Sequence, residues 1–504
     1  MLSLAIWVSL LFLLSSLLLL KTKKKVAPQK KKKQFPPGPP KLPLLGHLHL
    51  LGSLPHCSLC ELSRKYGPVM LLKLGSVPTV VISSAAAARE VLKVHDLACC
   101  SRPRLAASGR FSYNFLDLNL SPYGERWREL RKICVLVLLS ARRVQSFQQI
   151  REEEVGLLLK SISQVSSSAT PVDLSEKSYS LTANIITRIA FGKSFRGGEL
   201  DNENFQQVIH RASIALGSFS VTNFFPSVGW IIDRLTGVHG RLEKSFAELD
   251  TFFQHIIDDR INFVATSQTE ENIIDVLLKM ERERSKFDVL QLNRDCIKAL
   301  IMDIFLAGVD TGAGTIVWAL TELVRNPRVM KKLQDEIRSC VKEDQVKERD
   351  LEKLQYLKMV VKEVLRLHAP VPLLLPRETM SHFKLNGYDI DPKTHLHVNV
   401  WAIGRDPDSW SDPEEFFPER FAGSSIDYKG HNFELLPFGG GRRICPGMNM
   451  GTVAVELALT NLLLCFDWTL PDGMKEEDVD MEEDGGLAIA KKSPLKLVPV
   501  RCLN

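Results

Sequence analysis

The sequence predicts a mainly α-helical fold with a minor β part, preceded by one N-terminal transmembrane helix. Three observations support this prediction: an uncharged apolar stretch at the start, long segments in which apolar residues recur every three or four positions, and a few short strand-like runs. With 504 residues, 45% of them hydrophobic and 25% charged, the chain has the composition of a folded globular protein. Its ten scattered cysteines exclude a small disulfide scaffold and favour a reducing compartment.

The first 20 residues contain no charged side chain. At about 1.5 Å per residue they span roughly 30 Å, which is the thickness of the hydrocarbon core of a bilayer. We therefore expect residues 1–20 to form a transmembrane anchor. A cleaved signal peptide is the alternative, but its positive charge would precede the apolar region. Here eight lysines follow it, between Lys21 and Lys33, and the positive-inside rule places the rest of the chain in the cytosol.

The charge of the chain is concentrated in this lysine run. The formal net charge is +6, and the eight lysines leave −2 for the rest of the chain, so nothing indicates a nucleic-acid partner. The run opens a basic and Pro-rich linker, residues 21–40, which ends in FPPGPP. Its prolines favour a stiff extended spacer. Residues 41–504 show no break in composition and are expected to form one folded domain.

The predicted elements of this domain follow in chain order. Helices are predicted over residues 123–139, 141–165, 243–263, 296–325, 327–341, 350–367 and 449–466. Strands are predicted over residues 68–74 and 79–83, around a turn at Gly75, and more weakly over 376–388, 395–400 and 495–500. The helix over 296–325 is long and apolar, but it contains Lys298, Asp303 and Asp310. Because a charge at the centre of a bilayer costs about 2.5 to 3.5 kcal/mol, a buried helix is the better interpretation.

The most specific motif is PFGGGRRICPG, at residues 437–447. Phe438, Gly441, Arg443, Cys445 and Gly447 form the pattern FxxGxRxCxG. Glycines around a cysteine allow backbone N–H groups to face the sulfur and a flat ligand to approach it. A thiolate stabilised in this way, beside an arginine and before a helix that starts after a proline, can be an axial haem ligand. The alternative is an inert buried cysteine.

With this motif the sequence resembles the cytochrome P450 superfamily, the haem-thiolate monooxygenases. FPPGPPKLPLLGHLHLLG and SPYGERWRELRKIC resemble the plant A-type microsomal group, nearest its 71 family. The resemblance extends from about residue 36 to the C-terminus. It implies a cytochrome P450 fold for residues 41–504, haem b as cofactor and Cys445 as the iron ligand. It also implies a single-pass protein of the endoplasmic reticulum membrane whose catalytic body faces the cytosol.

The long predicted helix contains AGVDTG, at residues 307–312. Gly308 is expected to let a flat cofactor or dioxygen approach the helix backbone. The resemblance makes Asp310 and Thr311 the pair that delivers protons during dioxygen activation. Gly312 departs from the hydroxyl residue that many relatives carry, which weakens the relay slightly.

Several other charged residues receive roles from the resemblance. Glu363 and Arg366 are three apart on one helix, and with Arg420 of FPERF they are expected to form a buried charge network that braces the Cys loop. Haem propionates need cationic donors. The remaining haem contacts are expected from Trp127, Arg131, Arg377, Arg443, Phe438 and Gly439, with Arg102 as a weaker candidate.

The substrate-facing regions of the family map onto apolar side chains of this chain. They are Phe111, Phe115, Phe305, Leu306, Val309, Val371, Leu373, Leu374 and Ile489. Such a pocket suits a lipophilic molecule held by burial and entering from the membrane side. The alternative is that about half of these residues are ordinary core residues.

The chain has no nicotinamide or flavin motif of its own, since its one Gly-rich loop, residues 439–441, matches neither GxGxxG nor a P-loop. Electrons must therefore come from another protein, and the resemblance implies NADPH–cytochrome P450 reductase. Lys132 and Arg442 are candidates for its docking surface.

The predicted activity is insertion of one oxygen atom from O2 into a small lipophilic specialised metabolite. A terpenoid is favoured, and aromatic or amino-acid-derived compounds come next. Two alternatives stay open: a haem-thiolate isomerase or dehydratase that works without O2, against which Asp310 and Thr311 argue, and a non-catalytic membrane haem-binding protein.

Overall fold

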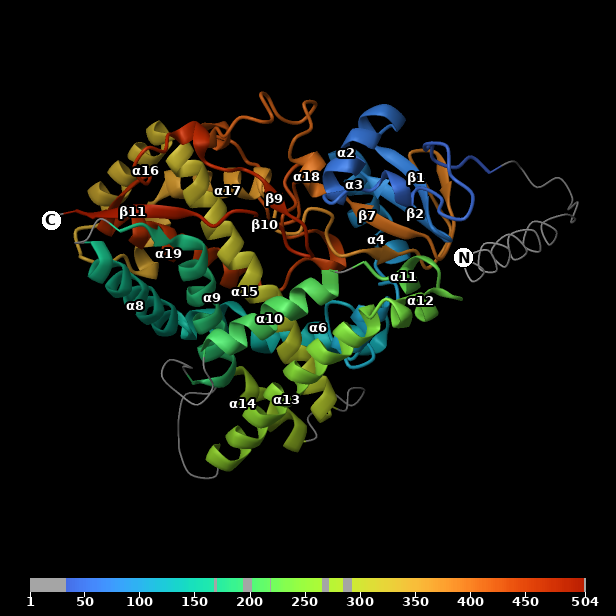
Figure 1. Cartoon of the computed structure of the whole chain (residues 1–504), viewed down its shortest axis with the longest axis horizontal. Helices are drawn as coiled ribbons and strands as arrows, with labels where there is room; N and C mark the ends of the chain where they lie inside the picture. Colours follow the sequence, from blue (N-terminus) through green and yellow to red (C-terminus); the bar gives the residue numbers. More distant parts are fainter. Residues whose placement is uncertain are drawn as a thin grey trace, which may run out of the picture.

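The computed structural model describes residues 33–166, 170–193, 202–217, 219–264, 272–283 and 292–502. The predicted anchor at residues 1–20 and most of the predicted linker lie outside the described residues. Figure 1 shows a helix-rich body with its largest sheet at one end, and this confirms the predicted mainly α class with a minor β part.

The longer helices cover most of the predicted helical segments. Their bounds are α2 Pro55–Tyr66, α6 Glu125–Lys132, α8 Gln148–Ser166, α9 Leu174–Phe191, α10 Asn202–Gly217, α13 Val238–Val264, α14 Ile273–Arg282, α15 Arg294–Arg325, α16 Pro327–Cys340, α17 Gln355–Leu367 and α19 Met448–Cys465. The shorter ones are α3 Ala85–Arg89, α4 Asp96–Cys99, α5 Ala106–Phe111, α7 Ala141–Ser146, α11 Val221–Phe224, α12 Gly229–Leu235 and α18 Val400–Ile403. Single helical turns and π-helical segments lie between them, at Leu48–Leu50, Glu90–Val94, Ile133–Leu138, Glu348–Lys353, Pro418–Phe421, Gly441–Arg443 and Glu476–Asp478.

The strands form one four-stranded sheet and three smaller ones among the described residues. Their bounds are β1 Val69–Leu74, β2 Val77–Ile82, β3 Val172–Asp173, β4 Arg377–Glu378, β5 Phe383–Leu385, β6 Tyr388–Ile390, β7 His395–Val398, β8 Phe466–Thr469, β9 Glu483–Asp484, β10 Ala490–Lys491 and β11 Lys496–Arg501. The largest sheet has the order β1-β2-β7-β4. β1 and β2 form an antiparallel hairpin that turns at Gly75, whose φ is 60°. β7 is parallel to β2 and antiparallel to β4, so this sheet carries Arg377 on its edge.

Helix α15 forms the centre of the helical part, where it packs against α9, α19 and α17 (Figure 1). By length and composition α15 and α19 are each long and apolar enough to cross a membrane. However, 61% of the most apolar window of α15 and 67% of that of α19 are buried inside the protein. Both are therefore core helices, as predicted for residues 296–325.

Some predicted helices are interrupted. The segment predicted over 123–139 is regular only to Lys132 and continues as a π-helical turn, and the segment over 141–165 divides at Phe147. Ser140 ends the first segment because its hydroxyl accepts a hydrogen bond from the Arg143 N–H and starts α7. The segment over 350–367 divides at Leu354, whose φ and ψ of −91° and 87° are not helical.

A charge network lies buried beside α17. Glu363 and Arg366 are 0% and 1% exposed, and the guanidinium of Arg366 donates to both carboxylate oxygens of Glu363, at 2.7 and 2.8 Å. Arg420 donates to Glu363 Oε1 at 2.9 Å. The remaining N–H groups of Arg366 donate to the carbonyls of Gly404, Pro413 and Glu415. The network thus ties α17 to residues 404–420, the segment that precedes the Cys loop in the chain.

We expect Arg366→Leu to lower the free energy of unfolding by about 3 to 5 kcal/mol, because it leaves the Glu363 carboxylate buried with too few partners. Chemical denaturation followed by tryptophan fluorescence measures this change. The control is Arg328→Leu, since Arg328 is exposed and pairs with Glu419 at the surface. That control should cost less than about 1 kcal/mol. Equal costs for the two variants would contradict the buried network.

Candidate active site

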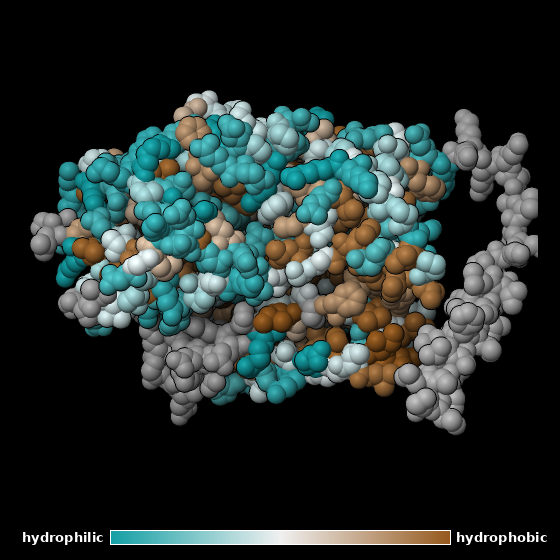
Figure 2. All heavy atoms as spheres, turned by 45° about the horizontal axis from the view of Figure 1, so that its top comes forward, coloured by the Kyte–Doolittle hydropathy of each residue, from teal (hydrophilic) through white to brown (hydrophobic). Residues whose placement is uncertain are grey.

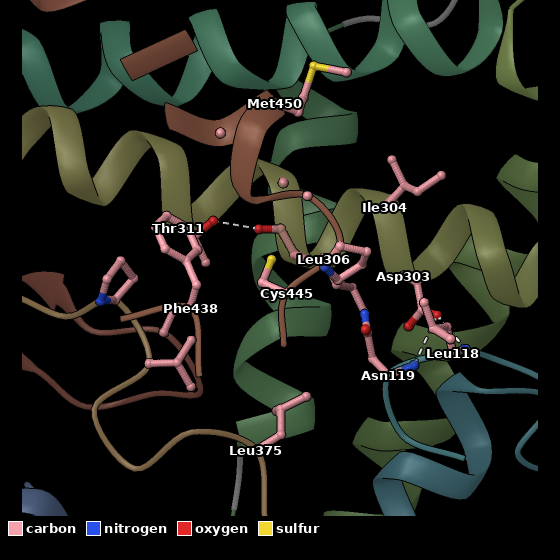
Figure 3. Close-up of a pocket in the computed structure, with 18 of the residues that line it drawn as sticks. Leu118, Asn119, Asp303, Ile304, Leu306, Thr311, Leu375, Phe438, Cys445 and Met450 are labelled. Carbon is pink, nitrogen blue, oxygen red and sulfur yellow. Dashed lines mark hydrogen bonds between the residues drawn. The ribbon is translucent and has the colours of Figure 1, made fainter. Parts of the chain in front are cut away.

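A largely apolar cavity of about 320 Å³ lies between α15 and the Cys loop (Figure 3). Its walls come from α5, α6, α9, α10, α15, α17 and α19 and from the segments at residues 117–120, 370–377, 437–447 and 487–488. Cys445 and Thr311 both line it. The predicted iron ligand and the predicted proton-delivery hydroxyl, far apart in the sequence, therefore meet at one cavity.

One position of the Cys loop, Gly441, requires a glycine. Gly441 has a φ of 67°, and a Cβ there would lie 2.3 Å from the carbonyl oxygen of Leu92. The Cys445 N–H donates to the carbonyl of Phe438 at 3.0 Å, which closes the loop. Phe438 and Gly439 line the cavity beside Cys445.

The electrostatics around Cys445 act in two directions. Burial raises the pKa of the thiol, while hydrogen bonds from the N–H groups of Gly447 and Met448 and the positive charge of Arg131 act to lower it. The two N–H groups belong to the start of α19, where unpaired backbone donors point out of the helix. The site thus supplies donors for a thiolate, and a bound metal ion would supply the charge that keeps the thiol deprotonated.

Four arginines line the same cavity: Arg102, Arg131, Arg377 and Arg443. Burial lowers the pKa of Arg443 to about 9 and also lowers the pKa of Arg131. Arg443 donates to the carbonyls of Cys100, Leu118 and Ser121, and its guanidinium lies 4.2 Å from the centre of the Trp127 ring. Among the described residues, the side chain of Arg131 has neither an ion-pair partner nor a hydrogen-bond partner.

This donor set fits an iron porphyrin. Desolvating a guanidinium is costly unless an anion accompanies it, and Arg131 faces the cavity without one. A porphyrin brings two carboxylates and an iron that accepts a thiolate. The residues that would hold the group are Cys445 for the iron, and Arg131, Arg443 and Trp127 for the carboxylates.

The other two arginines of the cavity, Arg377 and Arg102, already have hydrogen-bond partners within the chain. Arg377 donates to Asp96 Oδ1 at 2.8 Å and to the carbonyl of Gly440 at 2.8 Å, so a carboxylate of the chain already neutralises it. Arg102, the weaker candidate, donates to the carbonyls of Asn119, Leu375 and Pro376. Both line the cavity, where they can add positive potential to the bound carboxylates.

The residues of α15 divide between its two faces. Thr311 faces the cavity, and its hydroxyl donates to the carbonyl of Ala307 at 2.6 Å (Figure 3). Asp310 is buried behind it, and the pKa of Tyr179 on α9 is raised by burial and, to a smaller extent, by the charge of Asp310. Gly308 lines the cavity, where it was expected to let a flat cofactor or dioxygen approach the helix backbone. It also has a packing role, because a Cβ there would lie 2.8 Å from Ile186 Cδ1. The missing side chain therefore lets α9 and α15 pack closely.

Four of the nine predicted substrate residues line the cavity: Phe111, Leu306, Val371 and Leu374. Phe305 and Val309 do not, because they lie on the opposite face of α15. The Phe305 ring packs 5.1 Å from that of Phe191, and the carbonyl of Val309 accepts from Thr182.

The other three also lie elsewhere. Leu373 packs against the cluster of β1 and β2. The Ile489 N–H donates to the carbonyl of Pro370, while its neighbours Leu487 and Ala488 line the cavity. Phe115 covers Gly109. Five of the nine predicted residues therefore do not line this cavity.

Sequence reasoning missed several residues of the cavity. Ala307 and Ile304 lie one and two turns before Thr311 and could have been found by stepping back from it in helical intervals. Asp117 and Asp303 also line the cavity, and no motif indicated that these two carboxyl groups meet.

Comparisons with known proteins agree with this geometry. The family described as Cytochrome P450 matches residues 36–498. The chain is 55% identical over 467 residues to "Cytochrome P450 71B9" of Arabidopsis thaliana, which is 92% of this chain and 93% of that protein. It is 54% identical to "Cytochrome P450 71B37" of the same plant, over 93% of this chain and 94% of that protein. A solved structure of a zebrafish cytochrome P450 with abiraterone shares the fold, with a TM-score of 0.76 at 23% identity, covering 90% of this chain and 100% of that one.

We expect Cys445→Ser to abolish the carbonyl spectrum of a thiolate-ligated ferrous haem, because a serine hydroxyl does not replace the thiolate. Difference spectra of reduced, carbon monoxide-treated protein measure this. Cys134→Ala is the control, since Cys134 is a second buried cysteine that lines the cavity. The control should keep the thiolate spectrum. An unchanged spectrum in Cys445→Ser would refute the assigned ligand.

Proposed function

Because this chain belongs to the cytochrome P450 family and is a haem-dependent monooxygenase, we propose that it oxidises a small lipophilic specialised metabolite at a membrane surface. One oxygen atom of O2 enters the substrate, and the other leaves as water with two electrons and two protons. The electrons come from a separate NADPH–cytochrome P450 reductase. The observation that carries this proposal is the position of Cys445 and Thr311 on one apolar cavity.

Each residue of the site has a distinct task. When bound, the haem supplies the activation of dioxygen. Cys445 donates negative charge to its iron, and Arg131 and Arg443 bind its carboxylates. The Thr311 hydroxyl donates to Ala307, so its lone pairs are available to accept a hydrogen bond from a water in the cavity. We propose that Thr311 holds this water and that Asp310, one residue earlier on α15, helps to restore the proton that the water gives up.

The substrate is proposed to be a terpenoid, because the cavity wall offers much apolar surface and few polar groups near Thr311. Phe111, Ile304, Leu306, Val371 and Leu374 supply this surface. Such a wall binds a hydrocarbon skeleton by burial and holds it away from water.

The proposed docking surface for the reductase includes Lys132 and Arg442. Both are about half exposed. Lys132 pairs with Glu129 of its own helix, and Arg442 pairs with Asp96 at 2.9 Å. Because Arg442 also has this internal partner, Lys132 is the cleaner position for a charge reversal.

The proposed approach to the membrane is a surface patch of exposed apolar side chains, which gathers on one face in Figure 2. We define this patch as Leu42, Leu44, Leu45, Phe219, Val228, Trp230, Ile231, Ile232 and Leu235. Its two segments dock on one turn, since Gly75 donates to the carbonyl of Leu45 and Ser76 to that of Phe224. Residue 37 lies beside β1 of the same hairpin, where Leu71 donates to Pro37. The patch and residue 37 therefore lie near one sheet edge, which suits a protein that is tethered to a membrane through its N-terminal segment.

We expect the protein, reconstituted with reductase, NADPH and a plant metabolite extract, to yield a product that has gained one oxygen atom. Mass spectrometry identifies the product. Thr311→Ala should lower product and raise hydrogen peroxide per NADPH consumed, because the water is no longer held. Thr321→Ala is the control: Thr321 lies on the same helix and donates to the Val317 carbonyl, outside the cavity. NADPH-independent conversion would favour an isomerase, and no conversion with any fraction would favour a haem carrier.

We expect the double change Ile231→Glu and Leu235→Glu to weaken membrane binding in a chain that lacks residues 1–32, because it charges the centre of the patch. Flotation with phospholipid vesicles measures the bound fraction, and haem content verifies folding. Leu136→Glu is the control, since Leu136 is 68% exposed outside the patch. Equal binding of all three proteins would exclude the patch from membrane contact.

A further inference from the structure

Two carboxyl groups meet at the wall of the haem cavity. Asp117, in the loop before α6, is 1% exposed, and Asp303 lies on α15 two turns before Asp310. The two carboxyl groups are close enough for each to shift the pKa of the other, and both accept N–H groups of the same loop. Two ionised carboxylates repel each other at such close range in a buried place, and one shared proton removes this repulsion. Consistently, the buried Oδ1 of Asp117 has no donor among the described parts of the chain.

The pair fixes the backbone of the loop at residues 117–120. Asp303 Oδ2 accepts the N–H of Leu118 at 2.8 Å and that of Asn119 at 3.3 Å (Figure 3). Asp117 Oδ2 accepts the N–H of Leu120 at 2.7 Å. Three consecutive N–H groups of the loop are thus directed toward the carboxyl pair, which ties the loop to the central helix.

The carbonyl groups of the same loop point the other way, to donors of the haem cavity. The Leu118 carbonyl accepts the Trp127 indole N–H at 2.9 Å and Arg443 Nη1 at 3.2 Å. The Asn119 carbonyl accepts Arg102 Nε at 2.9 Å. The loop backbone therefore connects the carboxyl pair directly to three side chains that line the cavity.

We propose that Asp303, through a proton that it shares with Asp117, is a positioning residue that sets the orientation of the donors for the haem carboxylates. The shared proton keeps the two carboxyl groups together. When it is lost, two negative charges face each other in a buried place, the loop moves, and Trp127, Arg443 and Arg102 lose their common support. This inference rests on haem binding at Cys445 and is independent of the substrate.

The groups around the carboxyl pair determine the pH at which the shared proton is lost. Burial, and for Asp303 also the charge of Asp117, raises the pKa of the pair: Asp117 to about 6 and Asp303 well above its ordinary range. The charged and titratable groups facing the pair are Arg443 from the Cys loop, Arg102 from the segment before α5, the Cys134 thiol after α6 and the Cys296 thiol on α15. Both thiols have pKa values raised by burial, so they stay neutral.

The sign of the pH effect follows. Since both carboxyl groups have a higher pKa in the folded protein than in the unfolded chain, the folded state binds protons more tightly. The stabilisation is complete below the ordinary aspartate pKa of about 4 and is lost as the pH rises through the folded-state values. The proton held by Asp303 is lost at a higher pH than the proton held by Asp117.

The test is the rate at which the ferric protein transfers its haem to excess apomyoglobin, measured from about pH 6 to about pH 9. We expect the rate for the unmodified protein to rise about tenfold over this range. Asp303→Asn keeps an oxygen for the two loop N–H groups and a donor for Asp117, and it cannot lose a proton. Its rate should be slow and independent of pH, whereas Asp303→Leu should lose haem about tenfold faster at every pH.

Asp233→Asn is the matched control, because Asp233 is a buried carboxylate that accepts from Ser220 and Thr222, away from the haem cavity. It should keep the pH dependence of the unmodified protein. A pH-independent rate in the unmodified protein, or the same pH dependence in Asp303→Asn, would overturn the proposal. If Asp303→Leu does not fold, the comparison between the unmodified protein and Asp303→Asn still tests the proposal. A missing thiolate spectrum in the unmodified protein would instead refute the haem site itself.

Discussion

The physical constraint on which the proposed site depends is a sulfur that would carry negative charge inside an apolar cavity. Burial by itself favours the neutral thiol of Cys445. The chain offsets this with two N–H groups at the start of α19 and a cationic arginine, Arg131, on the facing wall. The glycine-rich turn that brings the sulfur there accepts no side chain at Gly441. Iron binding then supplies the charge that makes the thiolate the stable form.

Around this sulfur the protein controls its buried charges through backbone carbonyls. Arg443 and Arg102 are held by carbonyl groups rather than by carboxylates, which leaves their positive charge for a ligand. Arg377, in contrast, is neutralised by Asp96. Where charge has only a supporting role, as at Glu363 and Arg366, it is fully paired and fully buried. Apart from Arg377, the arginines that line the cavity have no carboxylate partner among the described residues, whereas the charges of the network beside α17 are paired.

Much of the fold and the centre of the site could be predicted from the sequence. Helical periodicity located α15, α16 and α19 to within two residues, because each buries a continuous apolar face. The pattern FxxGxRxCxG located Cys445. The break after Lys132, with its π-helical turn, could not be predicted, since it depends on packing against other elements. Periodicity also indicated that α15 is buried without showing which of its faces meets the cavity, so it did not indicate that Phe305 packs against Phe191.

The sequence by itself determined the chemistry of this protein: a cysteine in a glycine-rich turn, a threonine on a long apolar helix and arginines spaced to reach a flat cofactor. These are properties of residue types at short spacings, where the chain's own geometry limits the outcome. Only the tertiary structure decided which charges around the cavity are paired. Asp117 and Asp303 are 186 residues apart in the sequence. They come together only because α15 crosses the loop before α6. Contacts of that kind arise from packing, which no local pattern encodes.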